Sequence, residues 1–247
     1  MEMISLNDVS KTYATLTGSV HALEQIKLSI SQGELIALVG PSGCGKSTLL
    51  KIMGDLVEPS SGTIVIDGMS AQDARLKGMF SYVFQNPVLL PWRNVLDNVK
   101  LPLEILQKSD RSPADLLRMV GLEGSEGLYP HEMSGGMQQR VALARALAID
   151  PKVLLLDEPF GALDELTRQT LNFQLLKIWQ EIGITVLLVT HSISEALFLA
   201  DRVMVFSSRP GRLLEIIEVP FARPRDPDIR ETSSFQELVK CVRQMLG

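Results

Sequence analysis

Apolar and polar positions along this chain follow two patterns, and each pattern predicts a different kind of strand. Over residues 1–33 apolar and polar residues alternate, as at Leu28, Ser29 and Ile30, which predicts half-buried antiparallel strands. Three later runs are almost wholly apolar, which predicts strands buried on both faces of a sheet: residues 35–39, 153–156 and 184–189. Together the two patterns predict an α/β protein with an antiparallel β part at its N-terminus.

Shorter strands and helices are expected in the rest of the chain. Turn-forming residues and a proline bound two further strands, over residues 63–68 and 80–84. The predicted helices span residues 48–53, 94–107, 113–120, 136–149, 193–200 and 235–245, and the last predicted strands span 202–206 and 213–219. Because helices dominate between residues 88 and 150, we expect a helical subdomain inserted into the α/β core.

The predicted elements divide the chain into four segments. The N-terminal antiparallel part and the first part of the core occupy residues 1–86, and the helical subdomain occupies residues 87–150. The second part of the core spans residues 151–220, and a C-terminal loop and helix span 221–247. A chain of 247 residues is long enough for one such domain with one insertion.

Composition narrows the classes of function. A formal net charge of −5 disfavours a protein that holds nucleic acid through a broad basic surface, so we expect no nucleic-acid partner. The two cysteines, Cys44 and Cys241, lie far apart in the sequence, which suits a reducing cytosol better than a disulfide framework. We see no signal peptide and no apolar run of about twenty residues, so work at a membrane would require a membrane partner.

A glycine-rich stretch joins the apolar run 35–39 to the helix that follows it. Its residues are Gly40, Pro41, Ser42, Gly43, Cys44, Gly45, Lys46, Ser47 and Thr48. Between a strand and a helix this spacing predicts a phosphate-binding loop, whose glycines let consecutive backbone N–H groups converge on an anion. Lys46 would reach the β- and γ-phosphates, and the Ser47 hydroxyl would bind Mg²⁺. The alternative is a glycine-rich turn that binds nothing, which the strand and helix context disfavours.

Polar side chains at the carboxyl ends of predicted strands are candidates for the same site. Asp157 and Glu158 end an apolar run, and buried acids downstream of a phosphate loop fit a magnesium-organising acid and a base for the attacking water. Gln85 and His191 each follow another predicted strand, at the edge where α/β sheets present ligand-binding groups. The alternative for the acid pair is a solvated loop, and the alternative for His191 is a surface position without a function.

Taken together, these features resemble the ATP-binding subunit of an ABC transporter, and the resemblance covers nearly the whole chain. The matching motifs, in order, are the A-loop aromatic Tyr13, the Walker A run 40–48, the Q-loop Gln85, the signature Ser134-Gly135-Gly136-Met137-Gln138, the Walker B run 153–158, the D-loop Ala162-Leu163-Asp164 and the H-loop His191. The one departure is Met133, where the family usually has leucine. Both side chains are apolar and similar in volume, so little consequence is expected.

The resemblance implies a P-loop ATPase fold and the hydrolysis of ATP with Mg²⁺. In the family the adenine stacks on the A-loop aromatic, which is Tyr13 here, and the Walker A run binds the phosphates. The implied ligands of Mg²⁺ are Ser47, Gln85 and Asp157. The implied catalytic residues are Glu158 as the base, with Lys46, Gln85 and His191.

The resemblance also implies the partners of the chain. In the family two ATPase subunits pair head to tail, so that Ser134, Gly135 and Gly136 of one subunit complete the ATP site of the other. Asp164 would couple the two sites. Permease subunits hold the pair at the cytoplasmic face of the cell membrane, and a solute-binding protein delivers the cargo.

Three less general segments resemble the nitrate, sulfonate and taurine group of bacterial importers: residues 88–95, 160–168 and 208–212. Leu90, Pro91 and Trp92 form a candidate surface for the permease, with packing inside the helical insertion as the alternative. The transported solute cannot be read from an ATP-binding subunit.

Three other functions stay open, and one of them is an export ATPase, which the importer-like segments disfavour. A soluble ABC ATPase of DNA repair or translation would usually carry a long coiled-coil insertion or a second ATPase domain, which this chain lacks. A regulatory module that binds nucleotide without hydrolysis is disfavoured because the hydrolytic residues are all present.

Overall fold

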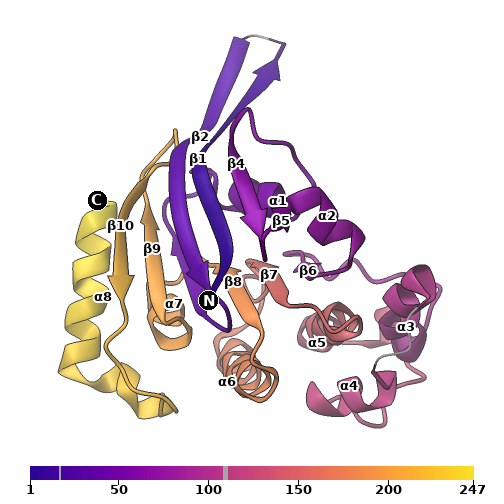
Figure 1. Cartoon of the computed structure of the whole chain (residues 1–247). Helices are drawn as coiled ribbons and strands as arrows, with labels where there is room; N and C mark the ends of the chain where they lie inside the picture. Colours follow the sequence, from indigo (N-terminus) through magenta and orange to yellow (C-terminus); the bar gives the residue numbers. More distant parts are fainter. Residues whose placement is uncertain (17, 108–110) are drawn as a thin grey trace. The chain divides into compact units, whose positions relative to one another are not determined.

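The computed structural model describes residues 1–16, 18–107 and 111–247, which fold into two compact units (Figure 1). Unit 1 comprises Met1–Ala74 and Thr185–Gly247, and unit 2 comprises Arg75–Ile184. Each unit combines strands and helices, so the prediction of an α/β fold is confirmed. The division into four segments stays a prediction.

The first strands of unit 1 form an antiparallel sheet in the order β2-β1-β4-β5. Its strands are β1 (Glu2–Thr15), β2 (Gly18–Ser31), β4 (Ser61–Ile66) and β5 (Met69–Ser70). Along β2 the side chains of Ile26, Leu28 and Ile30 are buried, whereas Lys27 and Ser29 between them are exposed. The alternation in the sequence therefore marks one buried face, and the predicted antiparallel β part is confirmed.

Four further strands of unit 1 lie side by side in the order β10-β9-β3-β8. β3 (Leu35–Val39) is parallel to β8 (Thr185–Val189) and to β9 (Arg202–Phe206), and β10 (Leu213–Glu218) is antiparallel to β9. Every residue of β3 and β8 is buried, because α1 (Lys46–Met53) packs on β8 and α7 (Ile193–Leu199) packs on β3. The predicted apolar strands of this mixed sheet agree with the structure to within one residue.

Unit 2 contains a parallel strand pair and a group of helices. The strands are β6 (Phe80–Val83) and β7 (Val153–Asp157), and the helices are α3 (Val95–Leu106), α4 (Pro113–Met119), α5 (Gly135–Leu147), α6 (Glu165–Ile182) and the 3₁₀ helix η1 (Pro130–Glu132). The helices predicted between residues 88 and 150 are thus present. No helix among the described residues is long and apolar enough to cross a lipid bilayer.

Several elements have no counterpart in the sequence analysis: α2 (Ala71–Leu76), β5, α6, η1 and η2 (Pro227–Glu231). The 18 residues of α6 are the largest omission. Its buried positions begin only at Leu171 and include the polar Asn172, so the apolar periodicity is short and interrupted.

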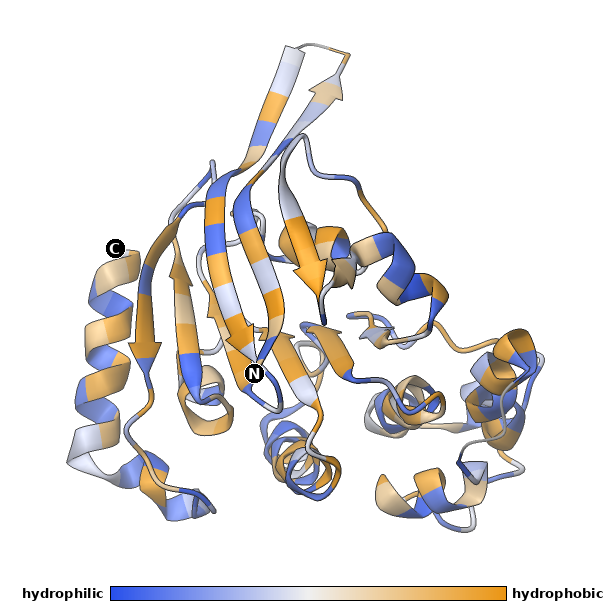
Figure 2. Cartoon of the chain, in the orientation of Figure 1, coloured by the Kyte–Doolittle hydropathy of each residue, from blue (hydrophilic) through white to orange (hydrophobic). Residues whose placement is uncertain are grey.

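The C-terminal helix α8 (Ser233–Leu246) packs against α7 and β9. Phe235, Val239 and Val242 are buried along one side of it. Figure 2 shows this helix with alternating hydrophobic and hydrophilic bands, as expected for one apolar stripe. Because α7 is itself buried, α8 forms the outer cover of this part of unit 1.

A buried arginine closes the carboxyl end of α7. Arg225 Nη1 donates to the carbonyl oxygens of Leu197 (3.2 Å), Phe198 (2.8 Å) and Ala200 (2.7 Å). The last carbonyls of a helix have no partner within the helix, so this guanidinium satisfies groups that would otherwise be buried without a donor. Burial, followed by the neighbouring charge of Arg223, lowers the pKa of Arg225 to about 10.

We expect Arg225→Met to lower the free energy of unfolding by about 3 kcal/mol, because it leaves several buried carbonyl groups without a donor. Urea denaturation followed by circular dichroism measures the change. Arg243→Ala, on the exposed side of α8, is the matched control and should change the stability by less than about 0.5 kcal/mol. Equal stabilities of the two variants would contradict the assigned role of Arg225.

Candidate nucleotide-binding site

The loop between β3 and α1 closes around the ammonium group of Lys46. Lys46 Nζ donates to Gly40 O at 2.8 Å and to Pro41 O at 3.1 Å, and the side chain is buried. A buried ammonium group is costly unless its donors are satisfied, and here two carbonyls and, at 3.5 Å, Cys44 Sγ of the same loop accept from it. The loop therefore holds a positive charge at its centre, as an anion-binding loop requires.

Two glycines of this loop are required by the backbone that lies against them. Gly45 has a φ of 107° and begins α1, and a Cβ atom there would lie 2.6 Å from Ala22 O. A Cβ atom on Gly40 would lie 2.9 Å from Phe206 Cβ. Gly45 is the N-cap of α1 and has no side chain that could accept a hydrogen bond. The N–H groups in the first turn of α1 therefore remain donors for an anion. Geometry and donors thus both agree with the predicted phosphate loop.

His191 and Tyr13 are the other predicted site residues of unit 1. His191 is exposed and follows β8, which runs parallel to β3, so the imidazole and the phosphate loop lie at the same edge of the sheet. Ser192 Oγ accepts from Glu195 N at 3.2 Å, which fixes the turn after His191 as the start of α7. Tyr13 is half-buried near the end of β1, with Lys11 Nζ 5.0 Å from its ring centroid.

In unit 2, a phenol holds the buried acid at the end of β7. Asp157 is 8% exposed, and its Oδ2 accepts from the hydroxyl of Tyr82 at 2.8 Å. Burial, followed by the charge of Asp157, raises the pKa of Tyr82 well above its usual range, so the hydroxyl stays protonated and remains a donor. The sequence analysis did not predict Tyr82 as a site residue. The one feature that could have indicated it is a hydroxyl group within a predicted strand, when another predicted strand ends in an acid.

Glu158 and Gln85 are brought together in the same unit. Gln85 Nε2 lies 3.4 Å from Glu158 Oε2, at hydrogen-bonding distance. Glu158 has a φ of 47°, in the left-handed region that non-glycine residues rarely adopt. Seven other non-glycine residues among those described also have a positive φ, so the backbone does not single out Glu158. The role expected for Glu158 stays a prediction.

The signature residues begin α5 as predicted. Ser134 is the N-cap, and its Oγ accepts from Met137 N at 3.3 Å. Gly136 is buried, and a Cβ atom on it would lie 2.7 Å from Thr167 Cγ2, so α6 packs directly on the first turn of α5. Glycine at this position is what allows the two helices to approach so closely.

Asp164 has a structural role that the sequence analysis did not foresee. Its Oδ1 accepts from Thr167 N at 3.0 Å, which makes Asp164 the N-cap of α6. This hydrogen bond from the backbone lowers the pKa of Asp164, so the carboxylate stays ionised. Because Thr167 also touches Gly136, the D-loop and the signature form one packed group.

Side chains of α5 hold the segment that follows β6. Arg145 Nη2 donates to Pro87 O at 2.7 Å, and Arg145 Nη1 donates to Val88 O at 2.8 Å. Gln139 Nε2 donates to Phe84 O at 3.4 Å. Burial lowers the pKa of Arg145. The backbone on both sides of Gln85 is thus tied to the helix that carries the signature, a connection that the sequence analysis missed.

The candidate permease surface is exposed at its aromatic residue. Trp92 is 72% exposed, although the loop that carries it is held firmly by the buried Asn98. Asn98 Oδ1 accepts from Leu90 N at 2.8 Å, and its Nδ2 donates to Arg93 O at 2.9 Å. A fixed loop therefore displays an indole ring to solvent, which agrees with an interaction surface.

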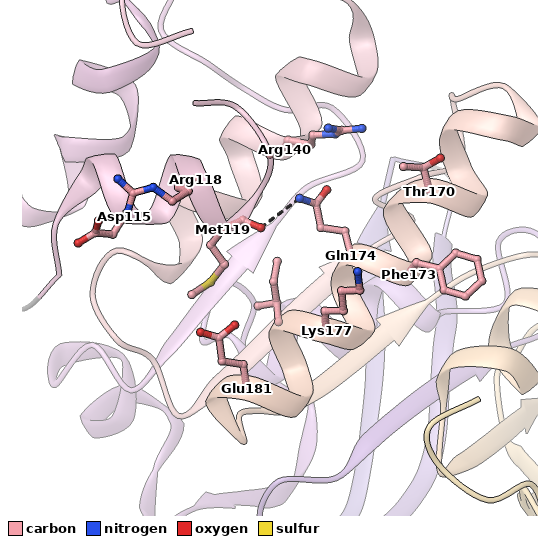
Figure 3. A pocket seen from close by; sticks show the side chains of 11 residues that line it. Asp115, Arg118, Met119, Arg140, Thr170, Phe173, Gln174, Lys177 and Glu181 are labelled. Carbon is pink, nitrogen blue, oxygen red and sulfur yellow. Dashed lines mark hydrogen bonds and ion pairs between the residues drawn. The ribbon is translucent and has the colours of Figure 1, made fainter. Parts of the chain in front are cut away.

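A groove of about 710 Å³ lies elsewhere in unit 2, among α4, α5 and α6 (Figure 3). Its lining combines the cations Arg118, Arg140 and Lys177 with the acids Asp115 and Glu181. Gln174, which also lines it, donates to Met119 O at 3.1 Å. Among the described residues that line this groove, none belongs to the predicted nucleotide site.

The predicted site residues thus fall into two groups. Unit 1 holds the phosphate loop, Tyr13 and His191, whereas unit 2 holds Gln85, the acids Asp157 and Glu158, the signature and Asp164. Their roles in binding a nucleotide stay predictions.

Comparison with known proteins identifies the family of this arrangement. The family model described as ABC transporter matches residues 23–161. The aliphatic sulfonates import ATP-binding protein SsuB of Bacillus cereus is 43% identical over 98% of this chain and 94% of its own length. The nitrate import ATP-binding protein NrtD of Synechococcus elongatus is 46% identical over 88% of this chain and 81% of its own length.

A solved structure shows the same fold. The dimeric structure of a post-hydrolysis state of the ATP-binding cassette MJ0796, bound to ADP and Pi, matches with a TM-score of 0.79 and 34% identity. The match covers 89% of this chain and 100% of that one. The chain therefore belongs to the ABC transporter family and is one of its ATP-binding domains.

Proposed function

We propose that this chain is the ATP-hydrolysing subunit of a bacterial importer for a small anion such as a sulfonate or nitrate. The observation that carries the proposal is the loop between β3 and α1, which closes around the buried ammonium group of Lys46. The relatives supply the transported class, since they are named as sulfonate and nitrate import proteins. Their names also support a permease partner, which would keep the chain at the cytoplasmic face of the membrane.

The phosphate loop would bind the triphosphate through its backbone amides and Lys46. The ammonium group of Lys46 would offset the charge that develops on the phosphate oxygens during hydrolysis. Tyr13 would stack on the adenine, and Thr48 would add a hydroxyl contact to the phosphates. His191, at the same sheet edge as the loop, would hold the γ-phosphate in place.

The residues proposed to bind Mg²⁺ fit its chemistry. Asp157 offers a buried carboxylate that is already oriented by Tyr82, and Ser47 offers a hydroxyl in the first turn of α1. Carboxylate and hydroxyl oxygens are ligands that Mg²⁺ accepts, and the amide oxygen of Gln85 would be a third. When bound, the ion would neutralise charge on the β- and γ-phosphates.

Glu158 would accept the proton of the attacking water, and Gln85, 3.4 Å from it, would orient that water. The signature residues Ser134, Gly135 and Gly136 would contact the γ-phosphate bound by a second copy of the chain, in a head-to-tail homodimer. The dimeric cassette structure supports such a pair. ATP can drive closure of the dimer only by binding the closed form more tightly than the open one.

Hydrolysis measured with and without the neighbouring permease tests the proposal. We expect magnesium-dependent ATP hydrolysis that the permease stimulates, in vesicles that also contain the solute-binding protein. Robust hydrolysis that ignores the permease would favour a soluble ABC ATPase. An absence of hydrolysis under both conditions would favour a regulatory module.

We expect Glu158→Gln to lower the ATP turnover by about a hundredfold or more, because the amide cannot accept the proton of water. ATP binding should persist, and gel filtration with MgATP should show a stable dimer. Glu237→Gln, at an exposed position of α8, is the control and should leave turnover unchanged. Normal turnover in Glu158→Gln would remove Glu158 from the role of base.

We expect Tyr82→Phe to raise the Mg²⁺ concentration for half-maximal ATP hydrolysis by about tenfold. The substitution removes only the hydroxyl that orients Asp157, and lost partners of metal-ligating groups have effects of this size. A Mg²⁺ titration of the hydrolysis rate measures it, with Tyr129→Phe at an exposed position as the control. An unchanged Mg²⁺ dependence would leave Tyr82 with a role in stability only.

A further inference from the structure

The turn between β9 and β10, residues 207–212, lies directly against the phosphate loop of unit 1. A Cβ atom on Gly211 would lie 2.0 Å from Cys44 O, so the two backbones are as close as glycine permits. Gly211 N donates to Ala22 O, and Glu24 N donates to Gly211 O, both at 3.0 Å. The turn is therefore fixed by hydrogen bonds to the middle of β2 and by close packing against the phosphate loop.

One side chain of this turn reaches the phosphate loop itself. Arg209 Nε and Nη2 both donate to the carbonyl oxygen of Gly43, at 3.2 and 3.1 Å. The turn that presents the arginine is braced by Ser207, whose Oγ donates to Pro210 O at 3.0 Å and accepts from Arg212 N at 2.9 Å. The braced turn thus holds the guanidinium group of Arg209 against the carbonyl oxygen of Gly43.

This contact holds one end of the peptide between Gly43 and Cys44. In a trans peptide the carbonyl and the N–H group point in opposite directions. With the Gly43 carbonyl held on Arg209, the Cys44 N–H faces the other side, where it donates to Pro41 O at 3.3 Å across the loop. Gly43 has a φ of 73° and no side chain, so the hydrogen bonds at the two ends of this peptide hold its orientation, and the bond from Arg209 is the one made by a side chain.

We propose that Arg209 is a positioning residue for nucleotide binding, which keeps the Cys44 amide turned into the phosphate loop. This inference rests on the proposed role of residues 40–48 in binding phosphate. The arginine acts through the backbone and does not touch the nucleotide. Because a loop amide binds a nucleoside diphosphate and triphosphate alike, Arg209 contributes to the affinity for both and leaves the chemical step unchanged.

The matched variants are Arg209→Ala, Arg209→Lys and Arg212→Ala. Arg212 belongs to the same turn, and its Nη2 lies 2.9 Å from Glu24 Oε2. Arg212→Ala therefore removes one exposed arginine contact of the turn, as Arg209→Ala does, but a contact that does not involve the phosphate loop. Isothermal titration with ADP gives Kd, steady-state hydrolysis gives kcat and KM for ATP, and thermal unfolding gives Tm for each variant.

We expect Arg209→Ala to raise Kd for ADP and KM for ATP together by roughly three- to tenfold, with kcat changed less than about twofold. Arg209→Lys should recover part of the affinity, because a single ammonium donor can still hold the carbonyl. Arg212→Ala should bind ADP as the wild type does. A loss of Tm alone would not produce this separation of KM from kcat.

Two results would overturn the proposal. The first is an unchanged affinity for ADP in Arg209→Ala, whatever its Tm. The second is a fall in kcat with intact ADP affinity, which would assign the arginine to γ-phosphate chemistry instead. If Arg209→Ala does not fold, the same comparison is made with Arg209→Gln. Lys46→Ala tests the proposed function of residues 40–48 separately from the role of Arg209. If this variant binds ADP as tightly as the wild type, residues 40–48 are not the phosphate-binding loop.

Discussion

Satisfying a buried ammonium group is the constraint on which unit 1 depends. The charge of Lys46 is out of contact with bulk water, so the carbonyls of Gly40 and Pro41 must turn toward it. That requirement closes the loop tightly, and β2 and β9 then approach it until only glycine fits at positions 40 and 45. The mixed sheet therefore supports an arrangement of charge as well as a hydrophobic core.

Unit 2 contains a buried negative charge, which is likewise stabilised by a hydrogen bond. Asp157 is buried at the end of an apolar strand, and a protonated phenol satisfies one of its oxygens. Around it, α5 ties the segment after β6 through Arg145, while α6 presses on the first turn of α5 at Gly136. Predicted site residues from distant parts of the sequence are thus joined by hydrogen bonds and packing to one helix. A displacement of α5 would carry the signature and the backbone beside Gln85 with it.

The strands that precede the predicted site residues could be predicted because a parallel strand buried on both faces is a continuous run of apolar residues. The run 35–39 coincides with β3, and the ends of β8 and β9 fall within one residue of the prediction. Helix α6 was not predicted because none of its residues before Leu171 is buried. In addition, Asp164 was interpreted only as a D-loop residue, although it is also the N-cap of this helix. Tyr82 and Arg209 escaped for another reason: each acts on a partner far away in the sequence, and no local pattern marks such a pair.

Unit 1 is built from both ends of the chain, whereas unit 2 is one continuous stretch between them. β3 is an early strand, yet both of its neighbours, β8 and β9, come late in the sequence. During synthesis on a ribosome, unit 2 can collapse as soon as it emerges, while β3 waits with two unpaired edges for the strands that flank it. The phosphate loop, translated among the first fifty residues, is therefore among the last parts of the protein to acquire its working shape.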